Sequence, residues 1–233
     1  MDNTVNKKVT AIILAAGNSL RFGDGSEKVK IEILGDTVLA HAVAAFENAE
    51  TVNSIIIVAK DTDIGFVKEH TRRFRKVVGV VAGGESRAQS ARVGVLSTGS
   101  DTEYVAIHDA ARCLVTPCMI DDANRAAFVH GAASLVTKIY DTVKKIDSDG
   151  KISQTLSRDE LLLAATPQVF SRELYLRALE ENEDLMGVTD DNSLLEKIGV
   201  KVFPVITDAP NLKITTKADI GYCEYILSER GKV

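Results

Sequence analysis

A small-residue loop near the start of the chain carries residues suited to binding phosphate groups. It reads Ala15-Ala16-Gly17-Asn18-Ser19-Leu20-Arg21-Phe22-Gly23 and directly follows an apolar run that begins at Val9. Small side chains let backbone N–H groups approach an anion closely. Arg21 offers a planar fork, and the nearby Lys28 a point charge, to several phosphate oxygens. Taken alone, this loop also fits an ordinary tight turn.

The glycine spacing of this loop argues against two common nucleotide-binding classes. It is neither G-x-G-x-x-G, as in dinucleotide dehydrogenases, nor G-x-x-x-x-G-K-[ST], as in P-loop NTPases. Both classes place those loops at the first strand-to-helix turn, so a hydride-transfer enzyme is disfavoured.

A second chemical segment, His108-Asp109-Ala110-Ala111-Arg112, follows the apolar run Tyr104–Ile107. Open parallel sheets bind ligands at the carboxyl edge, where such a segment emerges. Asp109 is then placed to hold Mg²⁺, which takes one or two carboxylates and completes its shell with water and substrate phosphates. The alternative is an ion pair between Asp109 and Arg112 that only closes the loop.

Two further segments supply backbone donors and a directed charge. Gly83-Gly84-Glu85-Ser86-Arg87-Ala88-Gln89-Ser90 offers flexible backbone and a hydroxyl at a helix start, although a capped turn would look the same. Asn211-Leu212-Lys213-Ile214-Thr215 places Lys213 within a short apolar run, where a directed charge is more natural than a solvated one.

The elements that must position these segments alternate between strand-length apolar runs and helical stretches. Such alternation predicts an α/β fold with a Rossmann-like, mostly parallel sheet flanked by helices. The expected strands are Val9–Ala15, Ile55–Val58, Val77–Val81, Tyr104–Ile107 and Ala133–Val136.

Helix signals occur at three places between and after these runs. An apolar stripe of helical spacing covers residues 38–46, and Thr116 followed by Pro117 is typical of a helix start. Thr216, with Asp219 three positions later like a capping box, predicts the start of the last helix.

The pattern changes over residues 138–165, which we expect to form a protruding β-arm. Tyr140–Ile146 and Ile152–Leu156 flank Asp147-Ser148-Asp149-Gly150, and Asp-Gly between two strand-like runs predicts a hairpin. A lone two-stranded arm would leave its apolar residues exposed, so it should dock elsewhere, with a partner subunit as one candidate. Residues 1–233 are otherwise expected to form a single domain.

Composition restricts the partners and the location. The chain has 233 residues, 45% of them hydrophobic, and its net charge of −5 argues against nucleic-acid binding. The first apolar run is too short for a membrane span and lacks a signal-peptide pattern, so we expect a cytoplasmic protein with no membrane partner. Three cysteines without a C-x-x-C pair and four scattered histidines predict buried thiols and no zinc site.

Taken together and in order, seven segments resemble the 2-C-methyl-D-erythritol 4-phosphate cytidylyltransferase family, CTP-using enzymes of the non-mevalonate isoprenoid pathway. The resemblance covers nearly the whole chain. The matching pieces are A-A-G-x-x-x-R at Ala15–Arg21, G-G-x-x-R-x-x-S at Gly83–Ser90, H-D-A-A-R at His108–Arg112, D-T at Asp141-Thr142, T-P-Q at Thr166–Gln168, T-D at Thr189-Asp190 and N-x-K-x-T at Asn211–Thr215.

The resemblance implies transfer of CMP from CTP to a small polyol phosphate, with pyrophosphate released and Mg²⁺ held by Asp109. Arg21, Lys28 and Lys213 would contact the CTP phosphates as catalytic residues. The acceptor would meet Arg112 and Thr189 of one subunit and Thr142 and Arg158 from the neighbour's arm in a homodimer. The cytosine and ribose pocket would comprise Ala15, Ala16, Gly17, Gly84, Glu85 and Ser90.

The chain departs from the family pattern at a few positions. The family usually has P-K-Q where this chain has Glu27-Lys28-Val29, and proline where it has Cys113. Two alternatives stay open beside the main interpretation. One is a ribitol 5-phosphate cytidylyltransferase, which would share the CTP-side motifs, and the other is a nucleotide-binding paralogue with weakened catalysis.

Overall fold

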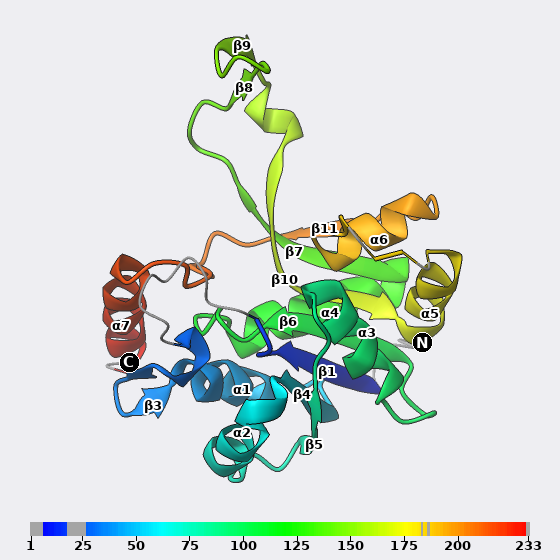
Figure 1. Ribbon diagram of the computed structural model, residues 1–233, viewed down its shortest axis with the longest axis vertical. Helices are drawn as coiled ribbons and strands as arrows, with labels where there is room; N and C mark the ends of the chain where they lie inside the picture. Colours follow the sequence, from blue (N-terminus) through cyan, green and yellow to red (C-terminus); the bar gives the residue numbers. More distant parts are fainter. Residues whose placement is uncertain (1–6, 18–26, 183, 186, 232–233) are drawn as a thin grey trace.

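A central seven-stranded sheet organises the computed structural model, which describes residues 7–17, 27–182, 184–185 and 187–231 (Figure 1). The strand order is β11-β7-β10-β6-β1-β4-β5, and only β10 runs antiparallel to its neighbours. The predicted mostly parallel sheet is therefore confirmed. Its strands are β1 Val9–Leu14, β4 Ser54–Ala59, β5 Val77–Ala82, β6 Tyr104–Asp109, β7 Ala132–Lys138, β10 Leu162–Ser171 and β11 Phe203–Ile206.

Helices cover both faces of this sheet because the strand side chains alternate between two apolar cores. Ala11 and Ile13 of β1 pack in the core with α1 and α4, whereas Ile12 and Leu14 face the core with α3, α5 and α6. The helices are α1 Val38–Asn48, α2 Ile64–Thr71, α3 Arg87–Leu96, α4 Pro117–His130, α5 Arg172–Glu181, α6 Asp191–Lys197 and α7 Ala218–Arg230, with short 3-10 turns η2 Lys28–Lys30, η3 Asp61–Asp63 and η4 Arg158–Glu160. In the described part of the chain, none of these helices is long and apolar enough to cross a membrane.

The predicted helix starts are confirmed for α4 and shifted for α7. The Thr116 hydroxyl caps α4 by accepting from the N–H of Met119 at 3.3 Å. The last helix begins at Ala218 rather than Thr216. Asp219 still reaches back, accepting the N–H of Thr216 at 2.7 Å, but Thr216 itself lies before the helix.

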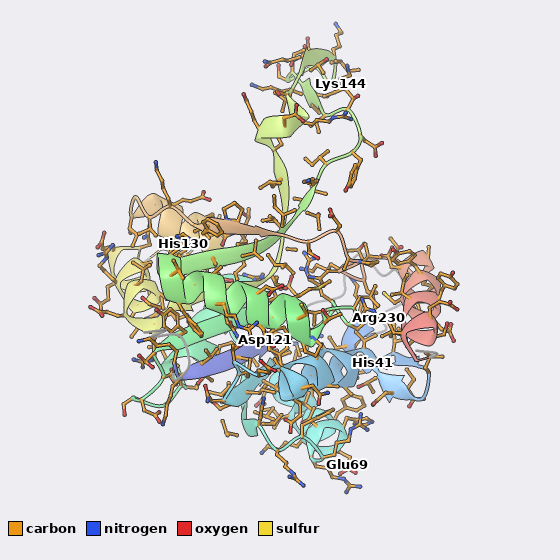
Figure 2. All side chains as sticks on the ribbon, turned by 180° about the vertical axis from the view of Figure 1, so that it is seen from behind. His41, Glu69, Asp121, His130, Lys144 and Arg230 are labelled. Atoms are coloured by element: carbon orange, nitrogen blue, oxygen red, sulfur yellow. The ribbon has the colours of Figure 1, made fainter. Side chains whose placement is uncertain are left out.

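The predicted hairpin lies at the end of an arm that projects from the sheet between β7 and β10 (Figure 1). Its strands, β8 Lys144–Ile146 and β9 Ile152–Thr155, pair antiparallel and are shorter than the runs in the sequence. Gly150 has a φ of 77°, which glycine adopts without strain. Figure 2 shows Lys144 at the far end of this arm, away from the body that carries Asp121.

Two smaller features complete the fold. A second hairpin pairs β2 Glu32–Ile33 with β3 Asp36–Thr37 beside α7. The expectation of three buried thiols is wrong for Cys118, which is exposed in the first turn of α4, where its side chain turns away from the sheet.

Candidate active site

The loops singled out in the sequence meet at the carboxyl edge of the sheet. Leu14 at the end of β1 stands in register with Asp109 of β6 and with Val58 of β4, so the loops that follow emerge side by side. They surround a cavity of about 540 Å³. Its lining comprises Leu14, Ala15, Ala16, Gly17, Lys28, Val29, Gly84, Glu85, Ser86, Arg87, Ser90, Asp109, Ala111, Lys213 and Ile214.

The loops after β1 and β5 lie so close that one position accepts only glycine. A Cβ atom on Gly83 would lie 2.7 Å from the Cβ of Ala16 and 2.7 Å from the Oγ of Ser90. The next residue, Gly84, donates its N–H to Ser90 Oγ at 3.2 Å. All six residues assigned to the cytosine and ribose pocket therefore line one cavity. Arg21, the remaining residue predicted on this side, lies outside the described residues.

Lys213 is held against the cavity by anchors on both sides of it. Asn211 donates its side-chain amide to the carbonyl of Thr166 at 2.8 Å and accepts from Arg112 Nη1 at its own carbonyl at 2.9 Å. On the other side, Ile214 is fully buried and donates its N–H to the carbonyl of Ala111 at 2.9 Å. This strand-like run thereby places the Lys213 ammonium at the end of β6.

Asp109 is the electrostatic centre of the site. Its Oδ2 accepts from Lys213 Nζ at 2.9 Å, and its Oδ1 accepts from Arg87 Nε at 3.0 Å. Burial alone would raise the pKa of Asp109, but the charges of Arg87 and Lys213 outweigh it and lower the pKa well below its usual range. The Asp109–Arg112 pair considered from the sequence is also present, with 3.7 Å between Arg112 Nε and Oδ2, but it is the longest of the three.

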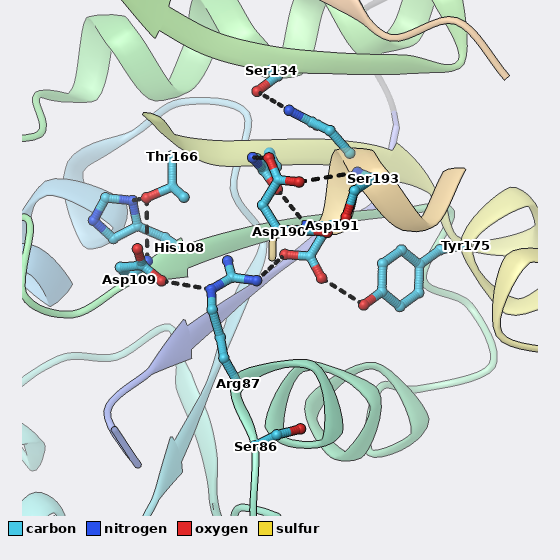
Figure 3. Close-up of polar contacts among 12 residues, drawn as sticks. Ser86, Arg87, His108, Asp109, Ser134, Thr166, Tyr175, Asp190, Asp191 and Ser193 are labelled. Carbon is cyan, nitrogen blue, oxygen red and sulfur yellow. Dashed lines mark hydrogen bonds and ion pairs between the residues drawn. The ribbon is translucent and has the colours of Figure 1, made fainter. Parts of the chain in front are cut away.

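Arg87 is a site residue that the sequence analysis did not assign. Its guanidinium bridges Asp109 and the buried Asp191, with 2.8 Å between Nη1 and Asp191 Oδ2, and the Tyr175 hydroxyl donates to Asp191 Oδ1 at 2.7 Å (Figure 3). Arg87 occupies the arginine position of the matched G-G-x-x-R-x-x-S segment, so that signal was available. Nothing local marked Asp191 or Tyr175 as its supports.

A second cavity of about 260 Å³ adjoins the first. Arg87, Asp109 and Lys213 line both cavities, so these three residues stand at the junction. Arg112 and Thr189, predicted to meet the acceptor, line the second cavity. The structure thus brings both of the residues predicted to meet the acceptor into the second cavity.

Thr142 and Arg158 are not brought to the site of their own chain. Both side chains are exposed on the arm, and neither residue lines either cavity. Arg158 Nη1 donates to the carbonyl of Tyr140 at 2.5 Å, a contact within the arm. Their predicted role in a neighbouring subunit stays a prediction.

His108 supports the loop from beneath and is not a candidate base. Thr166 Oγ1 accepts the N–H of Asp109 at 3.2 Å and lies 2.9 Å from His108 Nδ1. Burial lowers the pKa of His108 to about 3, so the imidazole is neutral at neutral pH. The Thr166 hydroxyl can then donate to Nδ1, which leaves the proton on Nε2 facing the carbonyl of Arg112 at 3.3 Å.

The donor set of the site suits a metal that takes few protein ligands. Among the described residues, no three His, Cys, Asp or Glu side chains gather to hold a metal ion by themselves. Arg87 pairs with Oδ1 and is itself held by Asp191, whereas Lys213, the partner of Oδ2, has a side chain that is 38% exposed. A site with one carboxylate fits Mg²⁺, which takes one or two carboxylates and completes its shell with water and phosphates.

Comparisons with known proteins bear on the family of this chain. Residues 9–229 match the family model of 2-C-methyl-D-erythritol 4-phosphate cytidylyltransferase. A curated relative of that name from Caldanaerobacter subterraneus is 38% identical, covering 94% of this chain and 98% of its own. One from Pelotomaculum thermopropionicum is 35% identical, covering 96% of this chain and 95% of its own.

Solved structures are similar in fold as well. The crystal structure of 4-diphosphocytidyl-2C-methyl-D-erythritol synthase from Anaerococcus prevotii superposes with a TM-score of 0.85 at 29% identity, covering 95% of this chain and 96% of that one. The Francisella tularensis 2-C-methyl-D-erythritol 4-phosphate cytidylyltransferase gives a TM-score of 0.78 at 26% identity, covering 94% and 99%. With a family model that matches residues 9–229 and a curated relative that is 38% identical over 94% of the chain, the chain belongs to the 2-C-methyl-D-erythritol 4-phosphate cytidylyltransferase family.

Proposed function

We propose that the chain transfers CMP from CTP to 2-C-methyl-D-erythritol 4-phosphate, forming 4-diphosphocytidyl-2-C-methyl-D-erythritol and pyrophosphate. The observation that carries this proposal is the junction of the two cavities, which share Arg87, Asp109 and Lys213. A nucleotide in the larger cavity and a phosphorylated acceptor in the smaller one would meet there. Family membership favours this acceptor over ribitol 5-phosphate, and the intact junction favours an active enzyme over a weakened paralogue.

The proposed reaction is an in-line displacement at phosphorus. An oxygen of the acceptor phosphate attacks the α-phosphorus of CTP, the bond from that phosphorus to the bridging oxygen breaks, and pyrophosphate leaves. The attacking phosphate is largely ionised near pH 7, so the protein has to align two anions and neutralise charge rather than remove a proton. Lys28, Lys213 and Arg21 suit that task, each contact supplying about 3 kcal/mol of transition-state stabilisation.

Selectivity for cytosine would come from the small residues that line the larger cavity. Ala15, Ala16 and Gly84 expose backbone groups there with little side-chain bulk. Such a pocket admits a pyrimidine and can read its polar edge with N–H and C=O groups.

We further propose that Asp109 would hold Mg²⁺ through its carboxylate. When bound, the ion would offset the negative charge of the CTP phosphates. Lys213 would then turn from Asp109 to the substrate phosphates, while Arg87 keeps the carboxylate in place.

The proposed assembly is a homodimer in which each arm reaches the acceptor cavity of its partner. Tyr140, Ile146 and Ile152 are 72%, 62% and 69% exposed on the arm of the single chain, an apolar surface suited to docking. Thr142 and Arg158 would then supply a hydroxyl and a guanidinium to the acceptor. We also propose that the protein is cytoplasmic, and we expect neither nucleic acid nor a membrane as a partner.

Pyrophosphate release tests the proposed function directly. Assays would combine CTP, ATP, GTP or UTP with 2-C-methyl-D-erythritol 4-phosphate or ribitol 5-phosphate, with Mg²⁺ or with EDTA. We expect high kcat/KM only for CTP with the methylerythritol phosphate, and loss of turnover in EDTA that added Mg²⁺ restores. Equal kcat/KM for the four nucleotides would contradict the cytidylyl assignment, a preference for ribitol 5-phosphate would contradict the acceptor, and full activity in EDTA would contradict the metal.

A further inference from the structure

A cluster of four charged side chains surrounds the short turn that carries Lys28 into the larger cavity. The turn is η2, and the cluster, here called the η2 charge cluster, consists of Glu27, Lys30, Lys60 and Asp63. Its two positive and two negative charges sum to zero. None of the four residues lines either cavity, so the cluster stands behind Lys28 and not in the site.

The contacts of the cluster connect η2 to the end of β4. Lys60 Nζ lies 2.9 Å from Glu27 Oε1, and Lys30 Nζ lies 2.7 Å from Asp63 Oδ1. Glu27 and Lys30 also pair with each other across the turn. The Lys30 ammonium sits 5.2 Å from the ring centroid of Phe66, a cation–π contact that adds a further point of attachment.

The backbone of η2 is closed on itself at the same place. Lys30 donates its N–H to the carbonyl of Glu27 at 2.9 Å, and Val29 packs against the core beneath α1. Lys28 thus lies between two residues, Glu27 and Lys30, whose side chains are both fixed. A shift of the η2 backbone at Lys28 would therefore disturb the ion pairs of Glu27 or Lys30.

A carboxylate next to a triphosphate site would ordinarily weaken binding by repulsion. Burial would raise the pKa of Glu27, but hydrogen bonds from Lys30 and Lys60 lower it to about 2, so Glu27 is ionised and neutralised by its partners. The two lysines therefore neutralise the charge of Glu27 next to the cavity, and the ion pair with Lys60 attaches η2 to the end of β4.

We infer that Glu27 is a positioning residue for Lys28, which it holds toward the CTP phosphates through its ion pairs with Lys60 and Lys30. This inference rests on the proposed function only in taking CTP as the ligand of Lys28. Loss of the Glu27 carboxylate would free one end of η2, spread the positions of the Lys28 ammonium and weaken nucleotide binding. Lys60 acts from the other side of the same pair.

The direction in which CTP affinity changes distinguishes a positioning role for Glu27 from a simple electrostatic effect. If Glu27 were only a negative charge near the phosphates, Glu27→Gln would strengthen CTP binding by removing repulsion. If Glu27 acts through Lys28, Glu27→Gln weakens CTP binding although it removes an unfavourable charge.

The test is a double-mutant cycle on CTP affinity, measured by calorimetry without acceptor. We expect Glu27→Gln and Lys60→Met each to raise the Kd for CTP about fivefold and to leave the KM of the acceptor unchanged. In a Lys28→Met background, Glu27→Gln should change the Kd less than about twofold, because the residue it positions is gone. Glu50→Gln is the matched control, since it removes an exposed ion pair with Arg125 (3.0 Å) that borders neither cavity.

Three outcomes would overturn the inference. Glu27→Gln could bind CTP more tightly, it could leave the Kd for CTP unchanged, or it could raise the Kd equally in the wild-type and Lys28→Met backgrounds. The third outcome would indicate a general structural effect. Thermal unfolding of each variant checks the last of these independently. Because the cycle reads binding and not turnover, its failure is distinct from failure of the proposed function. If the wild-type protein binds CTP but releases no pyrophosphate, the proposed reaction is wrong, whereas the inference about Glu27 and CTP affinity still stands.

Discussion

The carboxyl edge of the sheet and the β-arm treat their functional side chains in opposite ways. At the edge, the side chains of Asp109 and Asp191 are 10% and 1% exposed, and Arg87 holds both. On the arm, Thr142 and Arg158 are exposed and line neither cavity. The carboxyl edge fixes its charged side chains by burial and ion pairing, whereas the arm leaves its functional side chains exposed.

This difference indicates which parts of the site one chain can complete. The junction of the two cavities needs only contacts within the chain, and all of its described members are in place. The arm instead carries exposed apolar residues on a two-stranded hairpin, which is marginally stable without a packing partner. The nucleotide half should therefore tolerate changes in the arm, while the acceptor half should not.

The largest expected effect comes from removing Lys213, the partly exposed cation of the edge. Lys213→Met should lower kcat about 100-fold to 1,000-fold, as loss of one donor to a developing charge does. The free energy of unfolding should change by less than about 1 kcal/mol, because the Lys213 side chain is 38% exposed and Arg87 still pairs with Asp109. Steady-state kinetics and urea unfolding measure both, with the exposed Lys201→Met as control; near-normal turnover would remove Lys213 from the reaction.

A smaller effect is expected at Tyr175, which supports Arg87 through the buried Asp191. Tyr175→Phe removes the hydroxyl that donates to Asp191 at 2.7 Å, so a buried carboxylate loses one partner. We expect a loss of about 1–3 kcal/mol in the free energy of unfolding and about a tenfold fall in kcat/KM as Arg87 loosens. Tyr222→Phe, at an exposed tyrosine of α7, is the control. Lower stability with unchanged kinetics would make Tyr175 a core residue with no part in positioning.

Much of the edge was predictable from the sequence because its signals are local. The small-residue loop, the aspartate after a buried strand and the lysine in an apolar run each lie within a few residues, and the structure gathers them around one cavity. Arg87 was visible as a residue type, but its partner Asp191 is 104 residues away, and no local pattern encodes that contact.

The strands β10 and β11 were missed for physical reasons that differ. β10 contains Pro167, and its pairing with β7 shifts register between Ala164 and Gln168, so it shows neither a continuous apolar run nor regular alternation. β11 is a four-residue edge strand that is largely exposed, so burial left little pattern to detect. The arm hairpin was predicted because an Asp-Gly turn is a local signal, whereas its docking partner is not encoded locally.

The central claim is that the edge of one chain and the arm of another make one site, and subunit mixing tests it most directly. Arg158→Ala and Lys213→Ala should each be inactive alone. In a hybrid dimer, one site would carry both lesions and the other neither, so activity should return. Random exchange makes about half of the dimers hybrid with one intact site in each, which gives about a quarter of the normal rate.

Co-expression with two affinity tags isolates these hybrids, and pyrophosphate release measures their activity. Purified hybrids should reach about half of the wild-type rate, since one of their two sites is intact. Hybrids no more active than either parent would contradict the account, because the arm would then serve its own chain or Arg158 would not meet the acceptor.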